Sequence, residues 1–480
     1  GTLTQTGGSI GKAMTNNGTL NVNGGQYGGA ITNNGAKTFN VGGGTVKGAT
    51  TNSGGTISIT KGSVGGAITS SGTGKITISG DSTTQVNGAI TNGDGTNVAT
   101  LTISGGTTSG AITNKNKSTV TINNAAALVQ TGKLTNNSGG TVAFSDGTIK
   151  SEISNAGIIN QSGGSTGGAI TTSGTLNLSG GIISGAITNS YRINVTGGEI
   201  KTGVLTNNSG GTIHVEGGKI TSPITNKAYI EATTTNGVAA LQNAITNTGG
   251  KVYLKETGTL NNNAKISGGN LYIGLNTTSS DTITAKADNI AASTTEVYAT
   301  NTLKLTTGTL GGLVNGAGTL QISENVEAAA SYIGAGTNTV DTGKQLILTG
   351  KATKDPLGAL NKDVVGGGTV EIKTNNTITA NAMINTSFLH IQTNGTLCID
   401  VDCLGGNLGT AGLKNDGTIS LGADDKDQDS TKYSNSQNTL QITLSDGETK
   451  NGTVLFDADN DTDTGDTIHA DADKIKTTNN

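Results

Sequence analysis

Three histidines, two cysteines and one aspartate-rich run are the residues whose types could support chemistry in this 480-residue chain. None of His214, His390 and His469 has a serine or cysteine close by that would suggest a nucleophilic triad. Acidic residues in the first half are isolated along the chain, at Asp81, Asp94, Asp146, Glu152, Glu199 and Glu216. Carboxylates could still pair between distant segments, as general acid–base catalysis requires. We expect no catalytic residue, no cofactor and no enzymatic activity.

The aspartate-rich run near the carboxyl terminus has the spacing closest to a metal site. Alternate carboxylates at Asp459, Asp461, Asp463 and Asp466 could bind Ca²⁺ weakly, because Ca²⁺ prefers oxygen ligands. However, Gly465 falls one place late for an EF-hand loop, and no glutamate closes the loop. We favour a solvated acidic loop over a metal site.

The two cysteines, Cys398 and Cys403, lie close together. A zinc site needs about four ligands, and the sequence has no second cysteine pair. We predict a disulfide between them in an oxidising compartment, with two free thiols as the alternative. The loop that it would close is short, so its stabilising effect would be modest.

A recurring five-residue phrase organises the first half of the chain. It reads Gly-Ala-Ile-Thr-Asn at residues 29–33, 88–92 and 110–114, and near copies follow at intervals of 17 to 22 residues. This interval is too short for a helical-pair or propeller repeat and matches one coil of a parallel β-solenoid. The apolar position of the phrase predicts a core column, with Thr50 as its polar member, formed by Met14, Ile31, Ile68, Ile90, Ile112, Leu134, Ile153, Ile170, Ile187, Leu205, Ile224 and Ile245.

Each repeat contains three short strand signals separated by turn residues. After the Ile-Thr-Asn strand comes a segment that alternates apolar and polar residues, such as Leu20-Asn21-Val22, and then a single apolar site behind a glycine pair, such as Val46. Alternation with a period of two places both aliphatic residues inward. The predicted fold is an all-β, parallel β-helix with three sheets around a common core, and the glycine pairs are expected to supply positive φ at corners.

The asparagine of the phrase predicts a second column, where the strand turns. Asparagine tolerates left-handed backbone, and stacked amides can hydrogen-bond along the column. Its members are Asn16, Asn33, Asn52, Asn92, Asn114, Asn136, Asn155, Asn189, Asn207, Asn226 and Asn247. The threonine between the two columns should face outward in single file, which makes ice binding only a minor hypothesis.

Residues 1–254 are expected to form regular coils of 17–22 residues, and residues 255–480 a less regular continuation that ends in an acidic segment. Residues 288–299 and 324–332 are the only modest helix candidates in this second half. A net charge of −4 gives no basic surface for nucleic acid. No stretch approaches 18 consecutive apolar residues, so we expect no membrane-spanning helix.

The glycine-, asparagine- and threonine-rich coils with strands of the type Gly18-Thr19-Leu20-Asn21-Val22 resemble the passenger regions of bacterial type V autotransporters. Self-associating adhesins and vacuolating-cytotoxin-like passengers are the most similar in style. The resemblance implies a right-handed β-helix, export across the outer membrane, and display or release at the cell surface. Residues 454–468 resemble the region before the outer-membrane barrel, and we expect membrane contact only through such a barrel, outside this sequence.

From that resemblance we expect a cell-surface or extracellular adhesin that mediates attachment or cell–cell aggregation. Its partners would be ligands on host or neighbouring cells, or further copies of itself, and many weak polar contacts along a rigid surface would supply avidity. A toxin-like passenger that binds host receptors is the first alternative. A polysaccharide-degrading β-helix is the second.

Overall fold

The computed structural model describes residues 1–201, 203–274, 280–350, 359–380, 382, 384–392, 396–399, 413–415, 418–421 and 453–456. The chain divides into two units, Gly1–Lys251 and Val252–Asn480. The described residues of both form mainly parallel β-strands stacked as a solenoid, so the predicted all-β parallel β-helix is confirmed.

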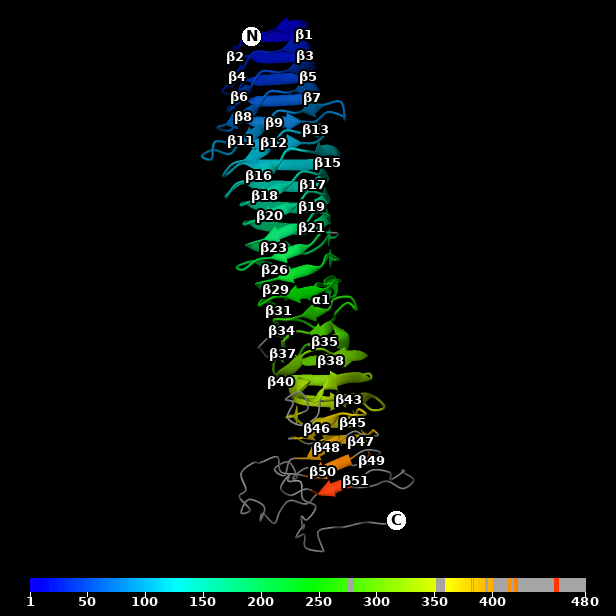
Figure 1. Ribbon diagram of the computed structural model, residues 1–480. Coiled ribbons are helices and arrows are strands. Elements are labelled where there is room, and N and C mark those ends of the chain that lie inside the picture. The colour runs from blue at the N-terminus through cyan, green and yellow to red at the C-terminus, as the bar shows by residue number, and fades with distance from the viewer. Residues whose placement is uncertain are drawn as a thin grey trace. The chain divides into compact units, whose positions relative to one another are not determined.

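In the first unit, two sheets run along the stacked coils, coloured blue to green in Figure 1. Sheet B contains the Ile-Thr-Asn strands, one from each coil, and every neighbouring pair is parallel and in register. Its strands in this unit are β2 (Met14–Asn16), β4 (Ile31–Asn34), β6 (Thr50–Ser53), β8 (Ile68–Ser71), β11 (Ile90–Asn92), β14 (Ile112–Asn114), β16 (Leu134–Asn136), β18 (Ile153–Asn155), β20 (Ile170–Thr172), β22 (Ile187–Asn189), β25 (Leu205–Asn207), β28 (Ile224–Asn226) and β30 (Ile245–Asn247).

Sheet A contains the second and third strand signals of each coil. Its strands in this unit are β1 (Thr2–Ile10), β3 (Thr19–Tyr27), β5 (Thr38–Val46), β7 (Thr56–Val64), β9 (Lys75–Ile78), β10 (Gln85–Val86), β12 (Thr100–Ile103), β13 (Thr107–Thr108), β15 (Thr119–Val129), β17 (Thr141–Ile149), β19 (Ile158–Thr166), β21 (Thr175–Ile183), β23 (Arg192–Val195), β24 (Glu199–Ile200), β26 (Thr212–Val215), β27 (Lys219–Ile220) and β29 (Tyr229–Ala232).

In several coils the second and third strand signals run on as one strand. The strand β21 passes through Gly180 and Gly181 without a break, and its register shifts against β19 there. Gly181 has a φ of +75°, which favours glycine. A side chain on Gly180 would place its Cβ 2.2 Å from the carbonyl oxygen of Ser162, one coil earlier. The glycine pair therefore bends the strand around the core while it stays hydrogen-bonded.

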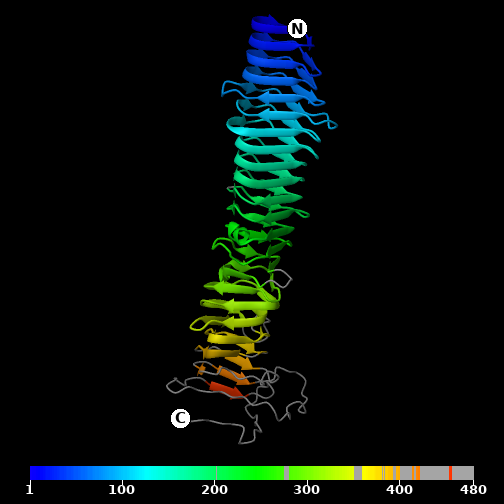
Figure 2. The same ribbon diagram turned by 180° about the vertical axis from the view of Figure 1, so that it is seen from behind.

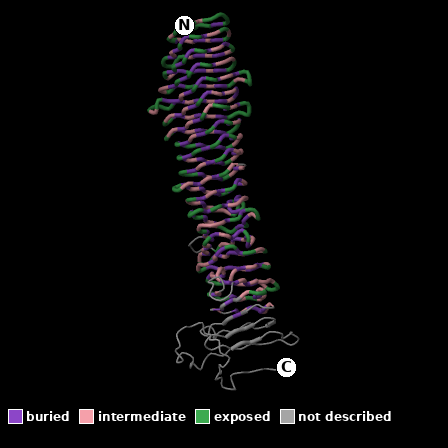
Figure 3. The backbone as a smooth tube through the Cα atoms, viewed as in Figure 1, coloured by how far each residue is buried: buried purple, intermediate pink, exposed green. Residues whose placement is uncertain are grey.

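Alternating burial explains why these segments form strands around one core. Figure 3 shows buried and exposed residues alternating along the coils, and in β3 the side chains of Leu20 and Val22 are fully buried while Asn21 between them is half-buried. Aliphatic residues thus stack on aliphatic residues of the next coil. Burial of this apolar area is the main stabilising contribution.

One short helix, α1 (Thr235–Ala240), interrupts the coil after β29. Its N-cap residue is Thr234, whose hydroxyl oxygen accepts a hydrogen bond from the backbone N–H of Gly237 at 2.9 Å. Val238 and Ala240 face the core. The sequence analysis did not predict this helix, because six residues are too few to show a helical period.

The second unit continues with less regular coils, seen from behind in green to red in Figure 2. Its strands in sheets A and B are β31 (Lys251–Leu254, which begins at the last residue of the first unit), β32 (Gly258–Thr259), β33 (Ile266–Ser267), β34 (Asn270–Ile273), β35 (Thr282–Lys286), β36 (Ile290–Ala291), β37 (Thr294–Val297), β38 (Thr302–Thr306), β39 (Gly308–Leu310), β40 (Leu313–Ile322), β41 (Val326–Ala329), β42 (Ile333–Val340), β43 (Gln345–Thr349), β45 (Val364–Ile372), β47 (Ile384–Ile391) and β49 (Leu413–Asn415). A third sheet comprises β44 (Ala359–Leu360), β46 (Thr377–Ala380), β48 (Thr396–Ile399), β50 (Thr418–Leu421) and β51 (Thr453–Phe456).

Both helix candidates of the second half were wrong. Only single 3₁₀ turns occur there, η1 (Ala287–Asn289) and η2 (Ala330–Tyr332), and the remaining described residues are mainly strand. The alanines that suggested helix are partly core residues of strands, such as Ala328 in β41. Burial of small side chains in the stack outweighs their helix propensity.

Candidate functional site

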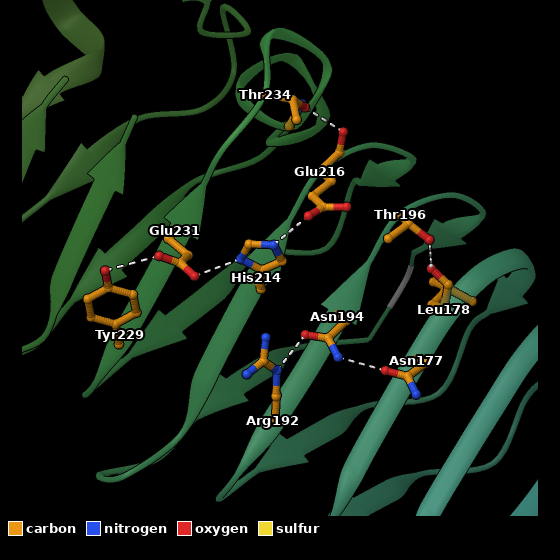
Figure 4. A network of polar contacts seen from close by, with 11 residues as sticks. Asn177, Leu178, Arg192, Asn194, Thr196, His214, Glu216, Tyr229, Glu231 and Thr234 are labelled. Atoms are coloured by element: carbon orange, nitrogen blue, oxygen red, sulfur yellow. Dashed lines mark hydrogen bonds and ion pairs between the residues drawn. The ribbon is translucent and has the colours of Figure 1, made fainter. Parts of the chain in front are cut away.

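A network of polar side chains lies on the outer surface of sheet A in the first unit, on strands β19 to β29 and the turns that follow them (Figure 4). Asn160, Asn177 and Asn194 stand in register on three successive coils. The Nδ2 of Asn177 donates to the Oδ1 of Asn160, and the Nδ2 of Asn194 donates to the Oδ1 of Asn177, both at 2.7 Å. The Nε of Arg192 donates to the Oδ1 of Asn194 at 2.7 Å, which fixes the end of this amide ladder.

The next residue in register with Asn194 is His214, which lies between two glutamates. Its Nδ1 is 2.7 Å from the Oε1 of Glu231, one coil further on, and its Nε2 is 2.8 Å from the Oε1 of Glu216, the first residue after its own strand β26. The side chains of His214 and Glu231 are only 17% and 16% exposed, whereas that of Glu216 is 45% exposed. The imidazole therefore joins the two coils.

Two further contacts extend this group toward α1 (Figure 4). The hydroxyl of Tyr229 donates to the Oε2 of Glu231 at 3.1 Å. The hydroxyl of Thr234, the N-cap of α1, donates to the backbone oxygen of Glu216 at 2.6 Å. Aromatic, basic, acidic and amide side chains thus meet on one face, next to the helix.

This group is not arranged as a metal site. The two ring nitrogens of His214 point in different directions, so Glu216 and Glu231 lie on different sides of the imidazole and cannot share one ion with it. Within the described part of the chain, no group of three His, Cys, Asp or Glu residues could hold a metal ion. The predicted Asp459, Asp461, Asp463 and Asp466 lie outside the described residues.

Residues that are rare elsewhere in the chain accompany the amide ladder. Arg192 is the single arginine of the sequence, and Tyr191 beside it is 57% exposed in a chain with only 2% aromatic residues. Ile158, which is in register with Thr175 and then Arg192, is 43% exposed. We call the outward side chains from Ile158 to Glu231 on this face the β19–β29 strip. It consists of Ile158, Asn160, Thr175, Asn177, Arg192, Asn194, Thr212, His214, Glu216, Tyr229 and Glu231.

The structure places the predicted aliphatic column in sheet B, in register from Met14 to Ile245. Ile112 and its counterparts are almost fully buried, and only Met14 at the first coil is half-buried. Thr50 is also buried, 2% exposed, and its hydroxyl has no hydrogen-bond partner. This column is structural.

The predicted asparagine column lies inside the solenoid, next to the aliphatic one. Its amides hydrogen-bond from coil to coil, for example from the Nδ2 of Asn33 to the Oδ1 of Asn52 at 2.8 Å and from the Nδ2 of Asn189 to the Oδ1 of Asn207 at 2.8 Å. Ser70 and Thr172 occupy the same column, and their hydroxyls accept from Asn52 and Asn155. The other predicted members of the column are Asn16, Asn92, Asn114, Asn136, Asn226 and Asn247.

The expected left-handed backbone at these asparagines was wrong. Among the described residues, only Lys117, Thr300 and Asn375 have positive φ without being glycine. The column asparagines are extended strand residues instead. Their side chains, not their backbone, meet the turn, as when the Nδ2 of Asn136 donates to the carbonyl oxygen of Gly140 at 3.1 Å.

Asp94 lies in a loop between β11 and β12, where several hydrogen bonds converge on its carboxylate. Its carboxylate accepts from the backbone N–H groups of Asn97 at 3.0 Å, Gly72 at 2.9 Å and Thr96 at 2.8 Å, and from the hydroxyl of Thr96. These hydrogen bonds, the one from Asn97 first, hold the pKa of Asp94 far below its ordinary value. Hydrogen bonds from Thr83 likewise lower the pKa of Asp81. Both carboxylates therefore stabilise the conformation of their loops through these hydrogen bonds.

The second unit has two smaller groups on its strands. The rings of Tyr253 and Tyr272 stack with centroids 4.4 Å apart, and that of Tyr298 follows at 5.9 Å. In the other group, the carboxylate of Glu371 accepts from the amides of Gln345 and Gln392, and its Oε2 is 3.5 Å from the Nδ1 of His390.

Several predicted residues are not placed. Cys403 and His469 lie outside the described residues, and of Cys398 only the strand position in β48 is described. The predicted disulfide stays a prediction. Among the described helices, none has the length and apolarity needed to cross a membrane.

Sequence reasoning missed the glutamate–histidine–glutamate contact. One signal was present, because Glu216 follows His214 by only two residues in the chain. The contact with Glu231 could be found only by counting one coil along the chain, since Glu231 follows His214 by 17 residues.

Comparison with protein-family models gave no match to this chain. Comparison with curated protein sequences gave none either.

Proposed function

We propose that this chain is an adhesin, displayed at the cell surface or released from it, that mediates attachment or cell–cell aggregation through multivalent polar contacts. As part of this proposal, the chain is a passenger of the type V autotransporter class that its coils resemble. It treats the outward side chains as a binding surface and assigns no catalytic step.

The repetition of outward polar side chains in register carries this proposal. On sheet B, every strand from Thr15 to Thr246 presents a threonine at the same outward position, except for Ser154. These side chains are exposed or half-buried. At a strand spacing of about 4.8 Å, the column is roughly 58 Å long.

Repetition of this kind favours avidity over a single tight site. A hydroxyl–ligand hydrogen bond contributes only about 0.5 to 1.5 kcal/mol net, because it replaces a bond to water. When many such groups engage one partner surface, each further contact forms within the complex already made, so the overall affinity can greatly exceed that of one contact.

Surface display tests the proposal directly. A bacterium that neither clumps nor attaches should do one or both when it displays this chain, measured by sedimentation and by counting cells bound to a host-cell layer. The same display scaffold without the chain is the control. Displayed chain that produces neither behaviour would remove the proposed function.

A set of variants tests the multivalent contact itself. The first set combines Thr32→Lys, Thr91→Lys and Thr171→Lys, which place three long cationic side chains on the otherwise neutral threonine column. These side chains should prevent close contact with a flat partner surface and so reduce clumping or attachment. Serine at the same three positions keeps the hydroxyls and is the matched control. Equal behaviour of the two sets would show that the sheet B column is not the contact surface.

A further inference from the structure

We propose that the β19–β29 strip binds a neutral, extended glycan chain that lies along the direction in which the strands stack. This inference deepens the proposed function by naming the ligand class of one site. It concerns a face of the solenoid different from the threonine column of sheet B.

The amide ladder is oriented before any ligand arrives. Asn177 donates one amide N–H to Asn160 and accepts from Asn194, each at 2.7 Å. An asparagine amide has two N–H groups and an oxygen with two lone pairs, so one N–H and one lone pair of Asn177 are not used by these two contacts. Arg192 holds the terminal Asn194 through its Nε. Binding would therefore cost little side-chain entropy.

The spacing of the ladder suits a polymer. One side chain per coil stands in register from Asn160 through Asn177, Asn194 and His214 to Glu231. At about 4.8 Å per strand this column is roughly 19 Å long. The spacing between neighbouring coils is comparable to the length of one sugar ring in an extended β-linked chain. Successive rings can therefore contact successive coils.

The composition of the strip fits sugar rings. Planar donors and acceptors, such as the amide of Asn194, the guanidinium of Arg192 and the carboxylate of Glu216, can bond to neighbouring hydroxyls of one ring. The exposed Ile158, in register with Thr175 and Arg192, offers apolar surface to the C–H groups of the sugar. A site that combines a few placed polar groups with apolar surface is the usual form of a small-molecule site.

Its charge favours a neutral glycan over an acidic one. Arg192 is the one arginine on the strip, whereas Glu216 and Glu231 carry carboxylates. A polyanionic glycan along the whole column would approach both glutamates, and like charges repel at such distances. A neutral chain meets no such repulsion.

The chain contains its own control for this proposal. Asn21 and Asn40 form a second amide ladder on the same sheet, where the Nδ2 of Asn40 donates to the Oδ1 of Asn21 at 2.8 Å. Lys75 occupies the column position of Arg192 on an earlier coil, through the register Lys75, Thr100, Thr119, Thr141, Ile158, Thr175 and Arg192. Neither Asn40 nor Lys75 lies on the strip.

Calorimetric titration of the purified full chain tests the strip. Cellohexaose, chitohexaose and mannohexaose are the neutral extended probes, maltohexaose is the probe of curved shape, and hexagalacturonate is the acidic probe. We expect at least one of the three extended neutral probes to bind. Asn177→Ala and Arg192→Ala should each weaken that binding about three- to ten-fold, as the loss of one or two hydrogen bonds predicts, whereas Asn40→Ala and Lys75→Ala should leave it unchanged.

The exposed Ile158 provides a variant with little risk to folding, because its neighbours in the column are Thr141 and Thr175, and Ile158→Thr should weaken binding by a similar factor. Failure of all three neutral probes, tighter binding of hexagalacturonate or maltohexaose, or equal losses in the strip and control variants would each overturn the inference. Because these titrations need no cells, they are independent of the display experiment. Cells that attach while the purified chain binds no probe would leave the proposed function standing and remove the glycan strip.

Discussion

The Nδ2 of Asn114 donates a 2.8 Å hydrogen bond to the Oδ1 of Asn136, one coil away, and both side chains are fully buried. The same nitrogen also donates to the carbonyl oxygens of Ser118 at 3.0 Å and Thr141 at 3.1 Å. Asn114 thus satisfies backbone carbonyl groups while it bonds to its neighbour in the column. Buried polar groups in such a network stabilise the fold only while every partner is present.

Removal of one column amide should destabilise the first unit strongly. Asn114→Ala leaves the Nδ2 of Asn92 and the Oδ1 of Asn136 without their partner, so we expect the free energy of unfolding to fall by about 2 to 4 kcal/mol. Urea unfolding followed by circular dichroism measures the change. Thr113→Ala, at the adjacent outward position, is the control and should cost less than about 0.5 kcal/mol. Equal losses in both variants would contradict the role given to the amide.

Completion of the aliphatic column should stabilise the first unit. Thr50 lies in register between Ile31 and Ile68, and its buried hydroxyl has no partner. Thr50→Val keeps the shape and removes the unsatisfied group, so we expect a gain of about 1 to 2 kcal/mol. Thermal and urea unfolding provide the measurement, with the outward Thr51→Val as the matched control. A loss of stability in Thr50→Val would mean that the hydroxyl has a partner in solution, such as a water molecule.

Gly66, the first residue of one copy of the repeated phrase, should tolerate no side chain. A Cβ on Gly66 would lie 2.0 Å from the carbonyl oxygen of Gly48, a backbone atom of the preceding coil. Gly66→Ala must push two coils apart, and we expect it to cost about 2 kcal/mol or more. On Gly65, by contrast, the nearest atom would be 3.9 Å away.

Gly65→Ala is therefore the matched control for Gly66→Ala. It should be neutral or slightly stabilising, because alanine restricts the unfolded chain more than glycine does. Urea unfolding of the two variants side by side measures the difference. Similar midpoints for both would argue that the coils are not packed as closely as the structure has them.

The carboxylate of Asp94 should become protonated at a lower pH than that of an ordinary aspartate. Hydrogen bonds from Asn97, Gly72 and Thr96 favour the ionised carboxylate and lower its folded pKa. The loop stabilisation is thus fully present above the ordinary pKa of about 3.9 and is lost only as pH falls toward the lower folded value. The amide signals of Gly72 and Asn97, followed by NMR from pH 7 to pH 2, should still be unshifted at the ordinary aspartate pKa of about 3.9.

Asp94→Asn provides the control for this titration, because its side chain cannot ionise. The Gly72 signal of that variant should show no acid transition that belongs to residue 94. A midpoint near the ordinary aspartate value in the unaltered chain would show that the hydrogen bonds do not form in solution.

Much of the first unit follows from the sequence by counting. Ile112 and Asn114 recur at almost constant intervals, and a parallel solenoid is the simplest fold that places such residues on top of one another. The second unit was harder to predict, since its coils differ in length and small residues such as Ala328 suit either a helix or a buried strand position. The corner at Gly180 and Gly181 was predicted from positive φ, but not that one strand continues through it.

The amino-acid sequence by itself determined the repeat, the alternation of inward and outward residues, and the columns of isoleucine, asparagine and threonine, because each depends only on spacing along the chain. Tertiary structure decided the contacts between coils outside these columns. His214 meets Glu231 because β26 and β29 pair in register, with the two residues 17 positions apart in the chain. Coils of different length keep their columns in register, because the turns between the strands take up the additional residues. Contacts across the stack therefore depend on how each turn takes up its residues, and that is set by how the turn packs on its neighbours.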